Sequence, residues 1–269
     1  MSRRVLYLIR HGRSDLDVKD YTRTAQGEQY DPPLGAIGKE QAELLARRLV
    51  AMQPPAAVYC SPLRRTRETV APYVERTGVE VQYEDDLVEA HIGEWETKTF
   101  EEILASDEAV MRNVLGQEAI WHLAPGAEMV DSLRRRVARA IDGMLERHPD
   151  GDIFVICHGG VINACIGPLL GIENEMFFLP ENTSVNSIVV NGDERRVRFL
   201  NDILRILLVT QQPSRQVVRG VHMGQHHFLK RRQFVFLRGI LFLMLLKYGK
   251  LHNLGTRLEI LRVKSIFGF

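Results

Sequence analysis

Five short apolar runs along the chain predict β-strands. The runs are rich in β-branched or aromatic residues and are bounded by turn residues, as strands usually are. They cover residues 5–9, 57–60, 79–83, 153–157 and 187–190. Several are apolar at every position, which is typical of strands buried on both faces.

Two longer segments between these runs follow a helical period. Residues 38–52 and 129–145 carry apolar side chains at spacings of three and four, so each predicted helix has one apolar face. The apolar positions are Ala42, Leu45, Ala46 and Leu49 in the first helix and Leu133, Val137, Ile141 and Leu145 in the second. Strands separated by such helices favour an α/β fold in which helices cover both faces of a mainly parallel sheet.

The composition is that of an ordinary globular protein. The 269 residues are 45% hydrophobic and 26% charged, which is enough for a full core and indicates one or two domains. The N-terminal apolar run ends at Arg10 and is too short for the core of a secretory signal peptide. Cys60, Cys157 and Cys165 have no CxxC spacing and lie in apolar surroundings. We therefore expect buried, reduced thiols and a cytoplasmic location.

The overall net charge of +1 conceals two regions of opposite charge. Residues 203–269 carry twelve Lys or Arg and one acid, Glu259, for a net charge of +11, whereas residues 1–202 carry −10. The chain therefore divides into an acidic main body and a basic C-terminal extension.

Two of the predicted strands end in the same dipeptide. Residues 5–9 lead into Arg10-His11-Gly12, and residues 153–157 lead into His158-Gly159-Gly160. In open α/β sheets the functional crevice lies beyond the carboxyl ends of the strands, so we expect both histidines to face it. The glycine after each histidine lets the backbone approach a ligand closely.

Two further segments add charged side chains to this crevice. The strand at 57–60 leads into SPLRRTRET, residues 61–69, in which Ser61-Pro62 predicts the start of a helix. The first turns of that helix present Arg64, Arg65 and Arg67. Glu89, within DLVEAHIGEWE, supplies a carboxylate.

Four motifs in chain order resemble the signatures of the histidine phosphatase superfamily, also called the phosphoglycerate-mutase-like family. They are RHG at 10–12, SPLRRTRET at 61–69, LVEAHIGEWE at 87–96 and ICHGG at 156–160. The resemblance covers about residues 3–202 and implies a three-layer α/β/α sandwich with a mainly parallel central sheet. It implies a catalytic domain over residues 1–205 with a cap segment at about 97–127, and it leaves residues 206–269 without a counterpart.

The resemblance also implies roles for individual residues. His11 matches the phosphorylated nucleophile, Glu89 the proton donor, and the phosphate pocket matches Arg10, Arg65 and His158. The family's S-x-L-x-R-x-x-x-T pattern aligns its arginine with Arg65, so Arg64 is expected to be a bystander.

We expect four small residues to contribute to substrate binding, namely Gly12, Ser14, Gly159 and Ser184. The segment at 182–185 resembles a family loop near the pocket, and a plain turn is an equally good interpretation.

These residue types suit phosphoryl transfer without reference to the family. Arginine binds phosphate oxygens bidentately and stays protonated, and a neutral histidine can attack phosphorus in line to form a phosphohistidine. A carboxyl group can protonate the leaving alkoxide and then accept a proton from water, provided that burial or nearby negative charge keeps it protonated beforehand. His158 as an imidazolium would add another cation. This chemistry calls for no metal ion or other cofactor.

Structural interpretations of the same residues stay open. Glu89 follows acidic residues at 84–86 and could belong to a solvated charged stretch, and His158 could be a hydrogen-bonded core histidine. For His91, Trp95 and His122, packing is favoured over a place on the substrate side of the site.

The sequence around the motifs favours a phosphatase over a mutase. Residues 13–17 read RSDLD where cofactor-dependent phosphoglycerate mutases usually have E-S-x-W-N, and residues 90–96 read AHIGEWE where they usually have R-x-Y-G-x-L-x-G. A mutase is the first alternative. A non-catalytic phosphate-binding protein on the same fold is the second, disfavoured because the charged positions are intact. A metal hydrolase is not supported, because the chain has no HExxH or clustered-carboxylate pattern.

The extension contains one long apolar stretch. Residues 234–246 read FVFLRGILFLMLL, which is short for a bilayer span of about 20 residues. Basic residues flank the stretch, so weak contact with an anionic membrane surface is a hypothesis. The loss of acidic residues also fits a shifted reading frame.

We expect a small phosphorylated metabolite as the partner and no nucleic acid, and the sequence is compatible with a homodimer.

Overall fold

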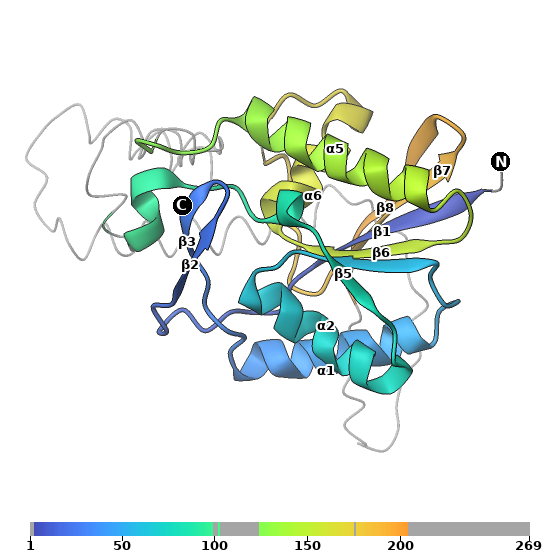
Figure 1. Cartoon of the computed structure of the whole chain (residues 1–269), viewed down its shortest axis with the longest axis horizontal. Helices are drawn as coiled ribbons and strands as arrows, with labels where there is room; N and C mark the ends of the chain where they lie inside the picture. The colour runs from blue at the N-terminus through green and yellow to red at the C-terminus, as the bar shows by residue number, and fades with distance from the viewer. Residues whose placement is uncertain (1–2, 99–101, 103–123, 175, 204–269) are drawn as a thin grey trace, which may run out of the picture. The chain divides into compact units, whose positions relative to one another are not determined.

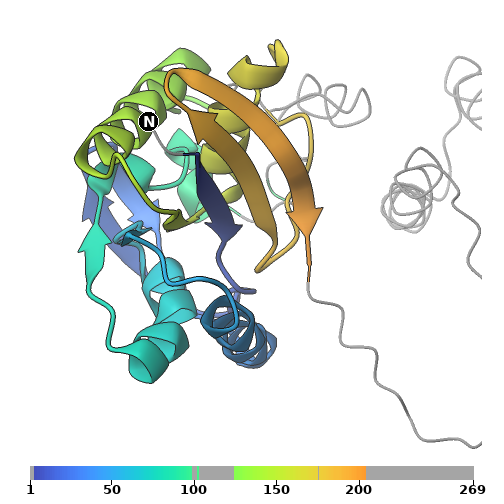
Figure 2. The ribbon, with the colours of Figure 1, turned by 90° about the vertical axis from the view of Figure 1, so that its right-hand side faces the viewer.

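The computed structural model describes residues 3–98, 102, 124–174 and 176–203, and within these ranges the centre of the fold is a six-stranded sheet. Its strand order is β5-β4-β6-β1-β7-β8 (Figure 1). The strands are β1 (Arg4–Arg10), β4 (Ala57–Cys60), β5 (Val81–Tyr83), β6 (Ile153–Cys157), β7 (Val185–Asn191) and β8 (Glu194–Asp202). The first four strands in this order are mutually parallel. The last two are antiparallel to their neighbours and form one edge of the sheet, drawn in orange in Figure 2.

Helices cover both faces of this sheet (Figure 1). Helices α1 (Ala36–Val50) and α2 (Arg64–Thr77) lie on one face, and α5 (Val130–Arg147) and α6 (Gly159–Ile166) lie on the other. Along β1, Leu6 and Leu8 belong to the core beneath α5, whereas Tyr7 and Ile9 belong to the core beneath α1 and α2. Because successive strand side chains point to opposite faces, an apolar run without alternation fills two cores at once. The expected three-layer α/β/α sandwich is confirmed.

The predicted elements are found with small shifts at their ends. The strand expected at 79–83 starts at Val81, because α2 ends at Gly78 in the left-handed region (φ 66°) and two residues are used to reach the sheet. The helix expected to start at Ser61-Pro62 starts at Arg64, after an extended Leu63. The expected apolar faces of α1 and α5 are buried as predicted.

Four helices and strands were not predicted from the pattern. They are the edge strand β8, the helix α6 and the two strands of a hairpin, β2 (Tyr21–Thr24) and β3 (Gly27–Tyr30), which pair antiparallel. The connecting 3₁₀ turns are η1 (Asp85–Leu87), η2 (Gly93–Thr97) and η4 (Pro168–Leu170). The hairpin matters for the site, because its Tyr30 carbonyl binds Arg65 and its Gln29 side chain bonds the Glu89 carbonyl. The turn η1 lies just before Glu89 in the chain.

The three cysteines are free thiols, as expected, and Cys60 and Cys157 are buried. Burial raises the pKa of the Cys60 and Cys165 thiols to about 12. Most of the cap expected at 97–127 and the whole extension at 206–269 lie outside the described residues, so the division at residue 205 stays a prediction. Within the described ranges, no helix has the length and apolar character needed to cross a membrane.

Candidate active site

The pairing of β1 with β6 brings the two His-Gly turns together. The strands are parallel with Arg10 opposite Cys157, so the residue that follows each strand lies beside its counterpart. The backbone N–H of His11 donates to the Cys157 carbonyl at 3.0 Å, and the ring centroids of His11 and His158 are 5.2 Å apart. The parallel register therefore places two imidazoles at one edge of the sheet.

The His11 ring has a defined tautomer. Its Nδ1 lies 2.7 Å from the Gly12 carbonyl oxygen. A carbonyl can only accept, so Nδ1 carries the hydrogen and Nε2 of the neutral ring keeps a free lone pair. Burial, followed by the charges of Arg65 and Arg10, lowers the pKa of His11 well below its usual value. At neutral pH the ring is a neutral base with Nε2 available.

The His158 ring is tied at the opposite nitrogen. Its Nε2 is 2.8 Å from the Ser61 hydroxyl, and its buried Nδ1 has no hydrogen-bond partner among the described residues. Burial, followed by the charges of Arg65, lowers the pKa of His158 well below its usual value. At neutral pH His158 is therefore a neutral ring and not the imidazolium expected from the sequence, because the ring is fully buried near the positive charge of Arg65.

Two arginines lie beside the histidines. Arg10, at the end of β1, donates from Nη1 to the Pro180 carbonyl, and its buried Nε has no partner within the described part of the chain. Arg65, in the first turn of α2, donates to the Tyr30 carbonyl at 2.9 Å and lies 3.6 Å from Asp31 Oδ1. Burial lowers the pKa of both guanidinium groups, and the nearby Glu89 carboxylate opposes that shift.

Glu89 reaches the same place from the opposite side. Its carboxylate accepts from the backbone N–H of Ala90 at 2.9 Å and of Gly160 at 3.1 Å. A Cβ built on Gly159 would lie 3.8 Å from Arg10 Nε and 3.9 Å from Glu89 Oε2, so both charged groups lie over the start of α6. On Gly160, a Cβ would be 2.4 Å from Glu89 Oε1, so a larger residue there would displace the Glu89 carboxylate from this position. Glu89 is thus half-buried and hydrogen-bonded, not part of a solvated acidic run.

The four small residues expected to bind substrate differ in position. The Gly12 N–H donates to Thr69 Oγ1 at 2.9 Å, and Gly159 opens α6. Ser184 is fully buried, its carbonyl accepts from the Arg10 N–H at 3.1 Å, and its hydroxyl has no partner among the described residues. Ser14 is half-buried and forms an isolated β-bridge with Leu34.

The loop before β7 is attached to the first His-Gly turn. Asn182 Nδ2 donates to the His11 carbonyl at 3.0 Å, and the Thr183 N–H donates to the Arg10 carbonyl at the same distance. Thr183 adopts φ 57°, a left-handed conformation that aims its N–H back at the turn. Of the two interpretations of residues 182–185, the structure favours a loop that supports the pocket.

The remaining candidates are accounted for by packing. His91 Nδ1 accepts from the Gly93 N–H at 3.2 Å, and its Nε2 lies 3.0 Å from the Glu28 carbonyl, so both nitrogens are satisfied. Trp95 is buried, and Arg64 is an exposed partner of Glu68. His122 lies outside the described residues. In the described ranges, no three His, Cys, Asp or Glu side chains are grouped so as to hold a metal ion.

Sequence reasoning gave no role to several residues that hold the site. Ser61 orients His158, Thr69 supports Gly12, and both belong to the SPLRRTRET motif, whose fixed Ser and Thr positions are a usable signal. Arg136 and Glu128 form a buried ion pair that bonds the backbone next to Glu89. The apolar pattern gave one indication of it, a charged residue on the apolar face of α5.

Comparisons with known proteins agree with this geometry. The family described as Histidine phosphatase superfamily (branch 1) matches residues 6–203. Phosphoserine phosphatase 1 of Hydrogenobacter thermophilus is 30% identical over 192 residues, which are 71% of this chain and 88% of that protein. A Yersinia enterocolitica protein described as "Probable phosphoglycerate mutase GpmB" is 29% identical over 167 residues, covering 62% of this chain and 75% of its own length.

A solved structure supports the same assignment. Bacillus stearothermophilus YhfR superposes with a TM-score of 0.64 at 26% identity and covers 74% of this chain and 98% of its own. The family match spans most of the chain and includes all four motifs. The chain belongs to the histidine phosphatase superfamily, branch 1, and is a histidine phosphatase enzyme.

Proposed function

We propose that the protein hydrolyses phosphate monoesters of small metabolites through a phosphohistidine at His11. The observation that supports this most strongly is the His11 ring: it is neutral, its Nδ1 hydrogen is bound by the Gly12 carbonyl, and its Nε2 therefore keeps a lone pair. That ring lies beside His158, and the charges of the buried Arg65 and the half-buried Arg10 act on it. A nucleophile with this surrounding charge suits a tetrahedral dianion.

In the first step the Nε2 lone pair of His11 attacks phosphorus in line with the ester oxygen. The P–N bond forms, the P–O bond breaks, and the carboxyl group of Glu89 gives its proton to the leaving alkoxide. The negative charge of the bound phosphate favours the protonated form of that carboxyl beforehand. Arg10 and Arg65 hold the phosphoryl oxygens and neutralise the charge that develops on them.

In the second step water attacks the phosphohistidine. The Glu89 carboxylate takes one proton from the water, the new P–O bond forms, and the P–N bond electrons return to His11 Nε2. Inorganic phosphate leaves, and both side chains regain their starting protonation states.

The unpartnered buried donors fit this account. Arg10 Nε and His158 Nδ1 both lack partners among the described residues. A buried polar group without a partner is unfavourable, and a bound phosphate would satisfy both atoms. For His158 this requires the hydrogen on Nδ1, with Nε2 accepting from the Ser61 hydroxyl.

A phosphoglycerate mutase is the alternative within the same chemistry. A mutase needs a bisphosphorylated cofactor to load the histidine, and it must keep the phosphohistidine from water while the substrate reorients. The departures at residues 13–17 and 90–96 from the usual mutase pattern favour hydrolysis. The relatives named above include both a phosphatase and a protein described as a mutase, so an assay with defined substrates has to distinguish the two activities.

We also propose a cytoplasmic location, on the basis of the cysteine pattern.

The test is release of inorganic phosphate by the full-length protein from alkyl and aryl phosphate monoesters, with chelator present and with vanadate added. We expect turnover that survives the chelator and is inhibited by vanadate. Phosphoglycerate is assayed with and without bisphosphoglycerate in parallel. Isomerisation that depends on bisphosphoglycerate and outpaces phosphate release would assign a mutase, and no turnover of any monoester would favour the non-catalytic binding protein.

A further inference from the structure

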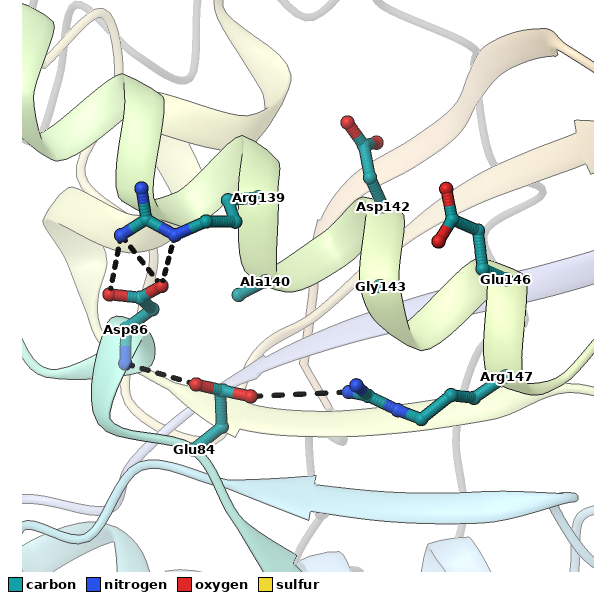
Figure 3. Close-up of a pocket in the computed structure, with 8 residues that line it drawn as sticks. All are labelled: Glu84, Asp86, Arg139, Ala140, Asp142, Gly143, Glu146 and Arg147. Carbon is teal, nitrogen blue, oxygen red and sulfur yellow. Dashed lines mark hydrogen bonds and ion pairs between the residues drawn. The ribbon is translucent and has the colours of Figure 1, made fainter.

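The segment that carries Glu89 is fastened to helix α5. Figure 3 shows Arg139 of α5 paired with Asp86, and Arg147 of the same helix directed at Glu84. These side chains line a cavity of about 460 Å³ between α5 and η1, and its lining includes neither histidine nor arginine of the phosphate pocket. The visible pairs are solvent-exposed, and exposed ion pairs contribute little to stability.

A third arginine of the same helix, Arg136, is bound in a different way. It is buried, and its guanidinium donates to three backbone carbonyls of one short segment. They are those of Asp86 at 2.7 Å, Val88 at 2.7 Å and Glu89 at 3.1 Å. Its other two N–H groups bond the carboxylate of Glu128 at 2.8 and 2.7 Å. Arginine has five N–H donors, and all five are used.

The Glu128 carboxylate compensates the buried charge of Arg136. The side chains of Arg136 and Glu128 are 4% and 6% exposed, and a buried guanidinium without a counter-ion is strongly destabilising. Glu128 also accepts from the His91 N–H, so the pair contacts the chain on both sides of Glu89. Gln29 of β3 adds a second donor to the Glu89 carbonyl at 2.8 Å.

These contacts act on the backbone of Glu89, whereas its carboxylate is held separately by the N–H groups of Ala90 and Gly160. A side chain can meet the leaving oxygen only if its backbone is fixed, because small misplacements of a catalytic group reduce the rate strongly.

We propose that Arg136, oriented by Glu128, is a positioning residue for proton transfer by Glu89. The five N–H groups of Arg136 all go to partners other than the two histidines; three of them hold the carbonyls of residues 86, 88 and 89, so that the Glu89 carboxyl stays over the start of α6. This inference rests on the proposed function of Glu89 as the acid and base.

The test compares Arg136→Lys with Arg139→Lys in the full-length protein. Lysine keeps the charge but lacks the planar fork that reaches three carbonyls and a carboxylate together. Arg139 is the matched control, because it lies one turn further along α5 and its bonds are to the Asp86 carboxylate at the surface. Thermal unfolding of each variant shows that it is folded before kinetics are measured.

Two substrates separate positioning of the acid from a general structural defect. An alkyl phosphate needs a proton on its leaving group, whereas dinitrophenyl phosphate releases a weakly basic anion that does not. General acid catalysis contributes about 10²- to 10⁴-fold, so for Arg136→Lys we expect kcat/KM to fall at least about 30-fold for the alkyl ester. For the dinitrophenyl ester it should change less than about 3-fold, while kcat falls because the second step still needs Glu89 as base. Arg139→Lys should leave both within about 2-fold.

A double-mutant cycle completes the test. In a Glu89→Gln background, Arg136→Lys should add less than about 3-fold to the loss with the alkyl ester, because residues that act through one group are not additive. Equal losses for both esters, or fully additive losses, would overturn the inference. If Arg136→Lys does not fold, Glu128→Gln is put through the same two assays and is held to the same outcomes.

The failure of the underlying function looks different. If wild-type protein turns over neither ester, or if His11→Asn retains full activity, the proposed function itself is wrong. Loss of activity in His11→Asn together with equal effects of Arg136→Lys on both esters leaves the function standing and removes only the positioning role.

Discussion

The two His-Gly turns come from the same sequence pattern and lie side by side, yet their imidazoles are bound at opposite nitrogens. His11 is tied at Nδ1 by the Gly12 carbonyl, whereas His158 is tied at Nε2 by the Ser61 hydroxyl. His11 is followed by a loop, and His158 is the N-cap of α6. The hydrogen-bond partner, not the motif, decides which ring presents a nucleophilic Nε2.

The partners differ because the two turns have different backbones. After His11 the chain runs close to the start of α1, since a Cβ on Gly12 would lie 2.8 Å from the Gly38 carbonyl oxygen, and the Gly12 carbonyl accepts from the His11 ring. After His158 the chain enters α6, so that its carbonyl is used by the Ile162 N–H and its ring reaches across to Ser61. The first turn thus leaves the lone pair on Nε2 of His11, where the proposed nucleophile needs it, and the second leaves Nδ1 of the buried His158 for the proposed contact with phosphate.

Replacing each histidine by asparagine gives the largest expected contrast. His11→Asn should lose at least about 10⁴-fold in kcat, because the covalent route is removed. His158→Asn should lose about 10²- to 10³-fold, the usual effect of removing one donor to a developing oxyanion. The measurement is kcat for an aryl phosphate with both variants at equal folded concentration. Equal losses in the two variants would contradict the assignment of different roles.

Ser61→Ala tests the difference between the two rings, because it removes the hydrogen bond to His158 Nε2 and leaves the bond to His11 Nδ1 in place. The hydroxyl bond is worth about 1 kcal/mol, so we expect about a 5- to 10-fold loss in kcat/KM. Ser187→Ala is the matched control: Ser187 is fully buried in β7, and its hydroxyl has no partner within the described ranges. An effect of Ser187→Ala as large as that of Ser61→Ala would show that the loss reflects packing alone.

The pH dependence of stability tests the state of His158 without any assay of catalysis. Because the pKa of His158 is lowered in the folded protein, the unfolded chain takes up a proton near pH 6.5 that the folded protein does not. The contribution of the neutral His158 ring to the free energy of unfolding is therefore complete above about pH 6.5 and is lost as the pH falls below it. His158→Asn should therefore flatten the fall in unfolding free energy below about pH 6.5 by up to about 1.4 kcal/mol per pH unit. Urea unfolding between about pH 7.5 and about pH 5.5 measures this. Identical pH dependence in wild type and variant would contradict a neutral, buried His158.

Much of the fold could be predicted from the sequence, because its signals are local. Continuous apolar runs such as residues 153–157 can only be satisfied by burial on both faces, and the faces of α1 and α5 repeat at helical spacing. The hairpin at residues 21–30 was missed, because it is polar and packs little of its surface. Helix α6 was missed, because it starts with two glycines, which usually interrupt helices.

The site divides in the same way. His11, His158 and Arg65 could be placed together, because parallel strands deliver their carboxyl ends to one edge. The protonation state of His158 could not, because it depends on burial and on the arginines around the ring. The role of Arg136 could not either, because its three carbonyl partners lie 47 to 50 residues away in sequence.

The most direct test is to locate the phosphoryl group on the enzyme. The wild-type protein is quenched during turnover of an aryl phosphate and kept at alkaline pH, and the modified residue and ring nitrogen are identified by peptide mass spectrometry and phosphorus NMR. The account predicts phosphate on Nε2 of His11, in wild type and in His158→Asn, and none in His11→Asn. Phosphate on Nδ1 of His11, or on His158, would contradict it.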